Sequence, residues 1–285
     1  MRIEVINKMR ERYPVATLCR LLQVQRSVYY WYGRRSVDDQ AALRASIRRL
    51  YEQHRGRYGS PRITHALRAE GWVVNHKRVE RLMRLEGLRA RMHRRRSVRT
   101  TDSRHSLPIA PNRLEQRFTV DSIDKVWLTD TTYVPTREGW LYVTTVLDLC
   151  SKRIVGWSMS HRNDRHMVCD ALTMALELRR PGKDLILHSD RGSTFASHDV
   201  RTLLAAHGVK QSMSRKGNCY DNAPAESWFA TFKRESDAGD IYPTRSIARA
   251  DIFEYIELYY NNYRLHSALN FYSPIQYERL HARLT

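Results

Sequence analysis

Three acidic residues in the second half of the chain have the types and positions that metal-dependent chemistry on phosphates would need. Asp130 lies within an apolar, β-branched stretch, where a buried charge is costly unless it has a partner. Asp190 directly follows an expected buried strand, and Glu226 falls in the first turn of an expected helix. Each one alone could be a structural acid. Three carboxylates on separate elements can instead converge on hard divalent cations, which suit phosphate substrates.

The elements that must position these acids follow from the hydrophobic pattern after about residue 118. Strands are predicted at 126–134, 140–147, 153–159, 184–188 and 209–213, and helices at 167–178, about 197–207 and 224–235. A helical tail is predicted over about 245–268. Three consecutive strands, followed by helices that alternate with strands, predict a mixed sheet flanked by helices, an α/β fold.

The charge of the chain is concentrated in its N-terminal part. Of the net charge of +19, residues 1–120 hold 28 basic and 10 acidic side chains, whereas residues 121–285 hold 21 and 20. A block this basic points to a polyanionic partner, with nucleic acid ahead of an anionic membrane. The chain has no apolar run long enough for a membrane span, and residues 1–4 have no apolar export region, so we do not expect export. Its four cysteines are scattered, and we expect them to be reduced thiols.

Two helical modules and a basic linker are expected within this N-terminal part. Residues 1–43 have the outline of a helix-turn-helix, in which Ser27 would cap the second helix. In the second module, 44–91, the helix after Asn75 has an apolar face that should bury Val79, Leu82, Met83 and Leu85. Its opposite, basic face is either a DNA contact, which we favour, or an ordinary solvated face, and comprises Lys77, Arg78, Arg81 and Arg84. The linker, 92–117, would track phosphates through arginines that include Arg94, Arg95 and Arg96.

The spacing of the acids carries a resemblance to a known family. Between Asp130 and Asp190 there are 59 residues, between Asp190 and Glu226 there are 35, and Lys233 stands seven positions after Glu226. With the strings Trp127-Leu-Thr-Asp130-Thr-Thr-Tyr, His188-Ser-Asp190-Arg-Gly-Ser-Thr-Phe and Tyr260-Asn-Asn-Tyr-Arg-Leu-His, the chain resembles the larger-frame protein of the insertion-sequence-three family of transposases, within the retroviral-integrase-like DDE superfamily. The resemblance spans nearly the whole chain.

The resemblance implies a ribonuclease H-like catalytic core over 118–240, preceded by all-α helix-turn-helix DNA-binding modules and followed by a helical tail over 241–285. It implies that Asp130, Asp190 and Glu226 hold two Mg²⁺ ions per active site, with Mn²⁺ as a possible substitute. The implied activity is hydrolysis at the ends of an insertion sequence and joining of the 3′-hydroxyl to target DNA. Lys233 would contact DNA, as would Lys216 and Asn218 in the polar segment before Glu226.

The partners implied are double-stranded DNA, as terminal inverted repeats and as target, and further copies of the chain in a dimer or higher oligomer. A smaller upstream-frame protein or a frameshift fusion is also implied, and the expected location is the bacterial cytoplasm, on the nucleoid. A catalytically silent DNA-binding regulator of the same fold is the alternative, which three intact acids argue against. A ribonuclease H or resolvase-type nuclease would not need two basic helix-turn-helix modules.

Three residues near the acids have structural interpretations. His188, beside Asp190, is expected to orient its neighbour rather than to bind metal. Asp221 is expected to cap or brace the helix that carries Glu226, and Asp148 to serve a turn.

Overall fold

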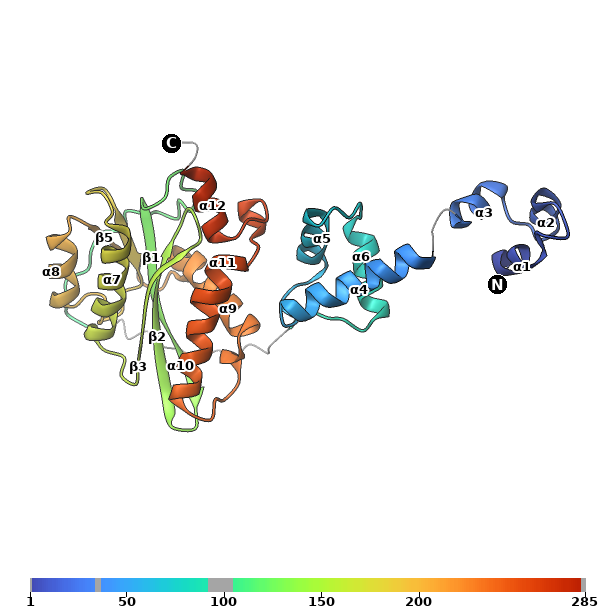
Figure 1. The fold of residues 1–285 in the computed structure, drawn as a ribbon. Helices are drawn as coiled ribbons and strands as arrows, with labels where there is room; N and C mark the ends of the chain where they lie inside the picture. The colour runs from blue at the N-terminus through green and yellow to red at the C-terminus, as the bar shows by residue number, and fades with distance from the viewer. Residues whose placement is uncertain (1, 34–36, 92–104, 283–285) are drawn as a thin grey trace. The chain divides into compact units, whose positions relative to one another are not determined.

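The computed structural model describes residues 2–33, 37–91 and 105–282 of the chain (Figure 1). The chain divides into two compact units, Met1–Ala90 and Arg91–Thr285. The candidates Arg94, Arg95 and Arg96 lie outside the described residues. Within the described part, no helix combines the length and the apolar composition that crossing a bilayer would require.

The first unit begins with three short helices, α1 (Arg2–Met9), α2 (Val15–Leu21) and α3 (Arg26–Gly33). A small core of Ile6, Leu18, Cys19 and Tyr29 holds them together, and the Tyr29 hydroxyl donates to Asn7 Oδ1 at 3.0 Å. Helix α3 begins at Arg26, so Ser27 stands inside the helix and is not its cap.

Helices α4 (Val37–Gln53), α5 (Ser60–Ala69) and α6 (His76–Leu85) pack against one another in the same unit. The Asn75 side chain accepts the Arg78 N–H, which confirms it as the N-cap of α6. Leu85 was expected to be buried, but it is 65% exposed. At about 100° per residue it lies about 200° around the helix from the buried Met83, on the far side of the apolar stripe.

The second unit is built on a five-stranded sheet with the order β3-β2-β1-β4-β5. The strands are β1 (Val126–Thr136), β2 (Gly139–Asp148), β3 (Ile154–Ser160), β4 (Ile186–Ser189) and β5 (Lys210–Met213). Strands β1, β2 and β3 form an antiparallel meander, whereas β4 and β5 run parallel to β1. The predicted mixed sheet is therefore confirmed.

Helices cover both faces of this sheet (Figure 1). Helices α7 (Arg165–Arg179) and α8 (His198–Ala206) lie on one face, and α9 (Ala223–Glu235) and α10 (Arg245–Phe253) lie on the other. Gly156 lets α7 approach β3 closely, because a Cβ at this position would stand 2.3 Å from the carbonyl oxygen of Ala171. The core between α7, α8 and the sheet includes the fully buried Trp127.

The tail continues α10 into a π-helix, Glu254–Tyr260, and then into α11 (Asn261–Tyr263) and α12 (Pro274–His281). The buried Asn261 pairs with the edge strand β3: its side-chain oxygen accepts the Ile154 N–H and its amide donates to the Ile154 carbonyl, both at 3.0 Å. The buried Arg264 forms a two-pronged ion pair with Glu235, the last residue of α9.

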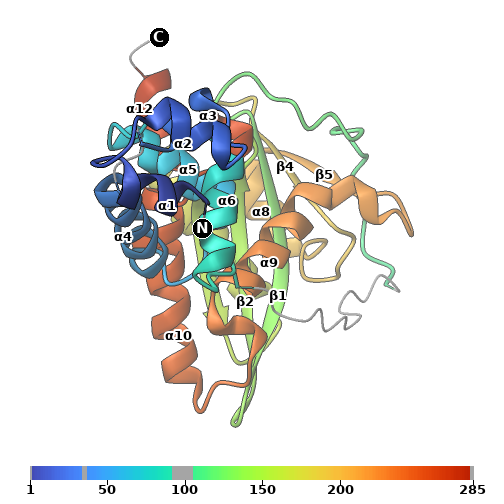
Figure 2. The ribbon, with the colours of Figure 1, turned by 90° about the vertical axis from the view of Figure 1, so that its right-hand side faces the viewer.

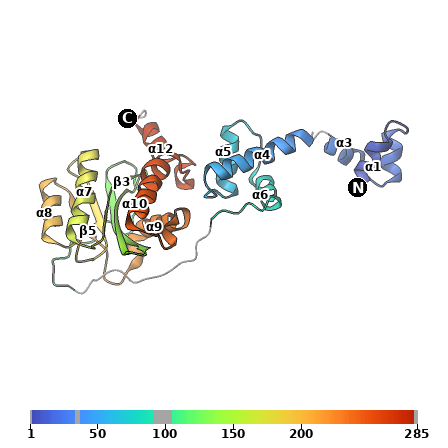
Figure 3. The same ribbon diagram turned by 60° about the horizontal axis from the view of Figure 1, so that its bottom comes forward.

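A segment without helix or strand, residues 105–117, packs beside β5 in the second unit, and we call it the strap (Figure 3). Leu107 and Ala110 contact the core, and Leu114 is buried. The arginine-rich composition of 92–117 indicates a polar linker, but the strap packs apolar side chains onto the core, and Pro108 and Pro111 exclude the helix that their spacing would otherwise indicate.

Candidate active site

The pairing of two parallel strands places Asp130 and Asp190 side by side. Leu128 on β1 is aligned with His188 on β4, so that positions two residues further along, Asp130 and Asp190, correspond to each other. Strand β4 ends at Ser189, whereas β1 continues to Thr136. Both acids therefore lie where β4 ends, at the carboxyl edge that commonly carries sites in sheets of this kind.

The Asp130 carboxyl is the electrostatic centre of the site. Burial raises its pKa well above the ordinary value, and the negative charges of Asp190 and Glu226 raise it further. The Thr131 N–H, which donates to Oδ1 at 2.7 Å, and the positive charge of Lys233 act in the opposite direction. The structure thus brings all three predicted acids and the predicted lysine into one electrostatic neighbourhood.

Asp190 is held by the turn that follows β4. Its Oδ1 accepts the N–H of Gly192 at 2.8 Å. A Cβ on Gly192 would stand 3.0 Å from the same oxygen, so a larger residue would press on the carboxylate. Glycine at this position allows the backbone to approach the acid closely.

Glu226 lies exposed in the first turn of α9, which packs against β1 (Figure 2). The buried face of α9 is aromatic. The Trp228 ring meets Tyr260 of the tail edge-to-face at 5.9 Å, and Phe232 meets Tyr255 at 5.4 Å. Such pairs add directional packing to the burial of apolar area. The tail therefore fixes α9 from the side opposite to Glu226.

Lys233 lies half-buried two helical turns after Glu226. Its Nζ stands 5.1 Å from the centre of the Tyr133 ring, which is a cation–π distance. Burial lowers the pKa of Lys233, and the charge of Asp130 raises it. The amine therefore stands close enough to Asp130 for the two charges to interact.

The three acids fit a divalent cation in their chemistry. Their oxygens are the donors that Mg²⁺ prefers, and their mutual repulsion at Asp130 is what a cation would relieve. Among the described residues, however, no three His, Cys, Asp or Glu side chains gather as ligands that could hold a metal ion. The acids share a site in this structure without the geometry of a metal centre.

His188 joins β4 to β5 beneath the site. It is fully buried, and its Nδ1 and Nε2 form hydrogen bonds with Ser212 Oγ at 2.9 Å and Ser214 Oγ at 3.2 Å. Burial lowers its pKa to about 4, so the ring is neutral near pH 7. Because both ring nitrogens are engaged, His188 has a structural part here and is not a metal ligand in this arrangement.

The loop before α9, residues 214–222, contains the other candidates for DNA contact. Lys216 is exposed, whereas the Asn218 side chain accepts the Tyr220 N–H at 3.0 Å and so caps the short 3₁₀ turn Cys219–Asn222. The same loop contains Asp221, which is fully buried and accepts hydrogen bonds from Arg215 and from two side chains of the strap. Asp221 therefore braces the loop, through partners that sequence reasoning missed.

Two further predicted groups can be placed. Asp148 accepts the N–H groups of Asp124 and Ser151, as the interpretation as a turn residue requires. In the first unit, Lys77 and Arg81 are exposed on α6, and Arg78 is half-buried.

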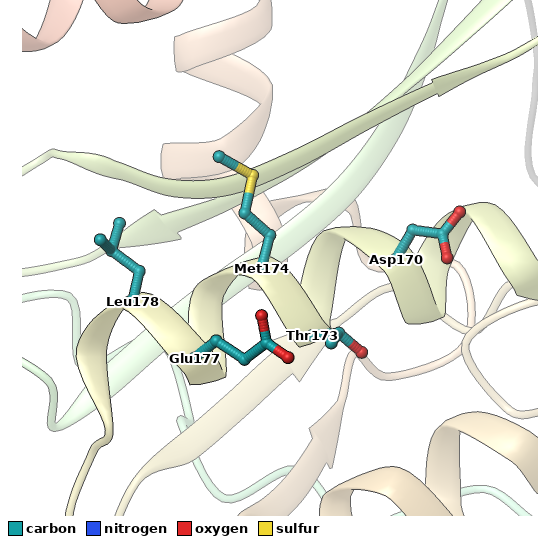
Figure 4. A pocket seen from close by; sticks show the side chains of 5 residues that line it. All are labelled: Asp170, Thr173, Met174, Glu177 and Leu178. Carbon is teal, nitrogen blue, oxygen red and sulfur yellow. The ribbon is translucent and has the colours of Figure 1, made fainter.

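A surface hollow along α7, drawn in Figure 4, contains none of the predicted site residues. Its lining comprises Asp170, Thr173, Met174, Glu177 and Leu178.

Comparison with known proteins agrees with this arrangement. Residues 122–219 and 226–281 match integrase core domain families, and residues 37–96 match an HTH-like domain. The chain is 40% identical to the transposase InsF for insertion sequence IS3A of Escherichia coli K12, over 98% of each chain. It is also 40% identical to the insertion element IS600 uncharacterized 31 kDa protein of Shigella sonnei, over 93% of this chain and 98% of that one.

Among solved structures, the catalytic core domain of BIV integrase is similar to 57% of this chain, over 99% of its own length, with 17% identity and a TM-score of 0.39. That similarity is too loose to support an argument on its own. The 40% identity over almost the full length of InsF, together with the matching domain families, is sufficient to assign the family. The chain therefore belongs to the transposase family of insertion sequence IS3, within the retroviral-integrase-like DDE superfamily.

Proposed function

We propose that this chain binds the terminal inverted repeats of an insertion sequence, cleaves its ends by Mg²⁺-dependent hydrolysis and joins the exposed 3′-hydroxyl to target DNA. The proposal is carried by the surroundings of the Asp130 carboxyl group. The charges of Asp190, Glu226 and Lys233 all lie close enough to interact with it. Membership in a transposase family supports the substrate, and the integrase core supports the reaction type.

In this proposal Asp130, Asp190 and Glu226 hold two Mg²⁺ ions, which Mn²⁺ can replace. When bound, such a pair of ions activates the attacking oxygen and stabilises the leaving oxygen of a phosphodiester. The chain itself orients the donors: β1 fixes Asp130, the Gly192 turn fixes Asp190, and α9 carries Glu226. Lys233 contributes a positive charge beside Asp130 that attracts the phosphate of the cleaved strand.

The division of charge along the chain supports separate tasks for its parts. The basic segments 1–43, 44–91 and 92–117 would hold DNA, and 118–240 with the tail 241–285 would carry the chemistry. Contacts to DNA are proposed for Lys77, Arg78 and Arg81, for Arg94 to Arg96, and for Lys216 and Asn218 near the site. The active form would be a dimer or higher oligomer on nucleoid DNA in the bacterial cytoplasm, with or without an upstream-frame protein or fusion.

The test compares Asp190→Asn with a matched control, Asp184→Asn. Asp184 is exposed and lies just before β4 begins, whereas Asp190 lies just after β4 ends. Cleavage of the cognate DNA ends is measured against Mg²⁺ concentration, and binding of the same ends is measured without metal. We expect Asp190→Asn to abolish cleavage and to leave binding largely intact, while the control behaves as wild type. Unchanged cleavage by Asp190→Asn would refute the proposal. Tight binding by the wild type without cleavage would instead indicate a silent regulator.

A further inference from the structure

One segment contacts both the loop that carries Asp190 and the loop that precedes α9, the helix that carries Glu226. His105 of the strap places Nε2 at 2.8 Å from the carbonyl oxygen of Arg191, the residue that follows Asp190. Eight residues later in the strap, the Arg113 N–H donates to Ser212 Oγ at 2.8 Å, at the end of β5. The strap therefore runs from the loop after β4 to the strand that leads into the loop before α9.

Asp221 is the point at which the strap meets the loop before α9. Its carboxylate accepts three hydrogen bonds from Arg215, from the backbone N–H at 2.8 Å, Nε at 3.1 Å and Nη2 at 2.9 Å. It accepts two more from the strap, from Asn112 Nδ2 at 3.1 Å and Gln116 Nε2 at 2.8 Å. Since Asp221 is fully buried, these donors replace the water that a carboxylate would otherwise bind.

The position of Asp221 relative to Glu226 gives these contacts a consequence. Asp221 lies within the 3₁₀ turn Cys219–Asn222, and that turn continues directly into α9 at Ala223. Glu226 is only five residues after Asp221, in the first turn of α9. A displacement of Asp221 would therefore be transmitted to the start of the helix that presents Glu226.

We propose that Asp221 is a positioning residue through which the strap sets the place of Glu226 relative to Asp190. The inference rests on the proposed function, because it assigns the strap to the same active site. It makes residues 105–117 a part of the catalytic unit rather than a connection to it. A misplacement of about 1 Å in a catalytic group can cost on the order of 10²-fold in rate, so weak tethers at this point matter.

The test uses the full chain with both strap donors removed, Asn112→Ala/Gln116→Ala, which leaves Arg215 paired with Asp221. The matched control is Arg117→Ala, on the same segment, because Arg117 pairs with Glu115 on the surface and both side chains are at least 60% exposed. Three quantities are measured: the Mg²⁺ concentration for half-maximal end cleavage, the affinity for DNA ends without metal, and Mn²⁺ binding followed by electron paramagnetic resonance.

In the double variant we expect the Mg²⁺ requirement to rise at least about tenfold and Mn²⁺ binding to weaken to a similar extent. We expect the affinity for DNA ends to stay the same, and amide exchange within residues 214–222 to accelerate. The control should match the wild type in all of these measurements. A double variant that only melts at a lower temperature, with an unchanged metal requirement and unchanged Mn²⁺ binding, would overturn the proposal.

The proposed function can fail separately. If the wild type binds DNA ends but does not cleave them with any metal, the catalytic assignment is wrong. Mn²⁺ binding and amide exchange in the double variant would still decide whether the strap acts through Asp221. Equal Mn²⁺ binding in the double variant and the control would then refute the inference about Asp221.

Discussion

The buried ion pair between Glu235 and Arg264 allows a quantitative prediction. Glu235 and Arg264 are 6% and 5% exposed. Arg264 donates from Nε at 2.6 Å and from Nη2 at 2.7 Å, one hydrogen bond to each carboxylate oxygen, and the Tyr255 hydroxyl donates to Oε2 at 3.1 Å. Removing one partner of such a pair leaves a charge in a place without water, which costs about 3–5 kcal/mol.

We therefore expect Arg264→Met to destabilise the second unit by about 4 kcal/mol. For a unit of this size that corresponds to a fall of about 8–16 °C in Tm. Thermal unfolding is followed by near-ultraviolet circular dichroism, to which the aromatic contacts of α9 contribute. Amide exchange along α9 should accelerate in the same variant, because Glu235 is the last residue of that helix.

The companion variant Glu235→Gln/Arg264→Met removes both charges and keeps an acceptor for Tyr255. It should recover more than half of the lost stability, because neither partner is left as a buried charge. Two results would refute the reasoning: a loss of less than about 1 kcal/mol of unfolding free energy in Arg264→Met, or equal losses in the single and double variants. Either would mean that the desolvation of Glu235 is unimportant.

Three further predictions concern other parts of the chain. Neutralising Lys77, Arg78 and Arg81 together should weaken binding to DNA ends and reduce the slope of log affinity against log salt by about two to three; an unchanged slope would mean that α6 does not contact DNA. Burial and neighbouring arginines lower the pKa of His54 to about 4, so the folded first unit resists protonation, and its stability should fall by up to about 3 kcal/mol as the pH drops from about 6.5 to about 4. His54→Phe should flatten that pH dependence in urea unfolding; equal pH slopes in both proteins would contradict it. Gly156→Ala should lower the free energy of unfolding by about 2 kcal/mol or more, because α7 must move away from β3. An unfolding midpoint at the same denaturant concentration as the wild type would show that α7 and β3 can separate at little cost.

Much of the fold can be predicted from local patterns. β-Branched and aromatic stretches around the Gly139 turn identify the first two strands, and the capping side chain of Asn75 identifies the start of α6. The resemblance that the spacing of the three acids carries implies that they share one site. The alignment of Asp130 with Asp190 cannot be predicted in this way, because it depends on how β1 and β4 pair after a long crossover.

Contacts between distant segments account for what the patterns missed. Asp221 obtains its strap donors from Asn112 and Gln116, which are 109 and 105 residues away in the chain. Leu107, Ala110 and Leu114 have the i, i+3, i+7 spacing of a helix face, but Pro108 and Pro111 argue against a helix there, so this spacing did not mark them for burial. Helix α12 begins with a capping box at Ser273. The sequence contains this signal, but the predicted helical tail ends near 268 and so leaves α12 out.

The π-helix in the tail places a constraint on the length of the chain. Each of its turns holds more residues than an α-turn, so the π-helix sets the direction in which Asn261 leaves the helix and meets Ile154. Loss of a single residue between 254 and 260 would let this stretch close into an ordinary α-helix and leave Asn261 facing β3, whereas an added residue would rotate Asn261 by about 100° away from β3. A change of side chain at the exposed Leu258 would not turn Asn261. Divergence within this stretch should therefore tolerate substitution and the loss of one residue but not a further insertion.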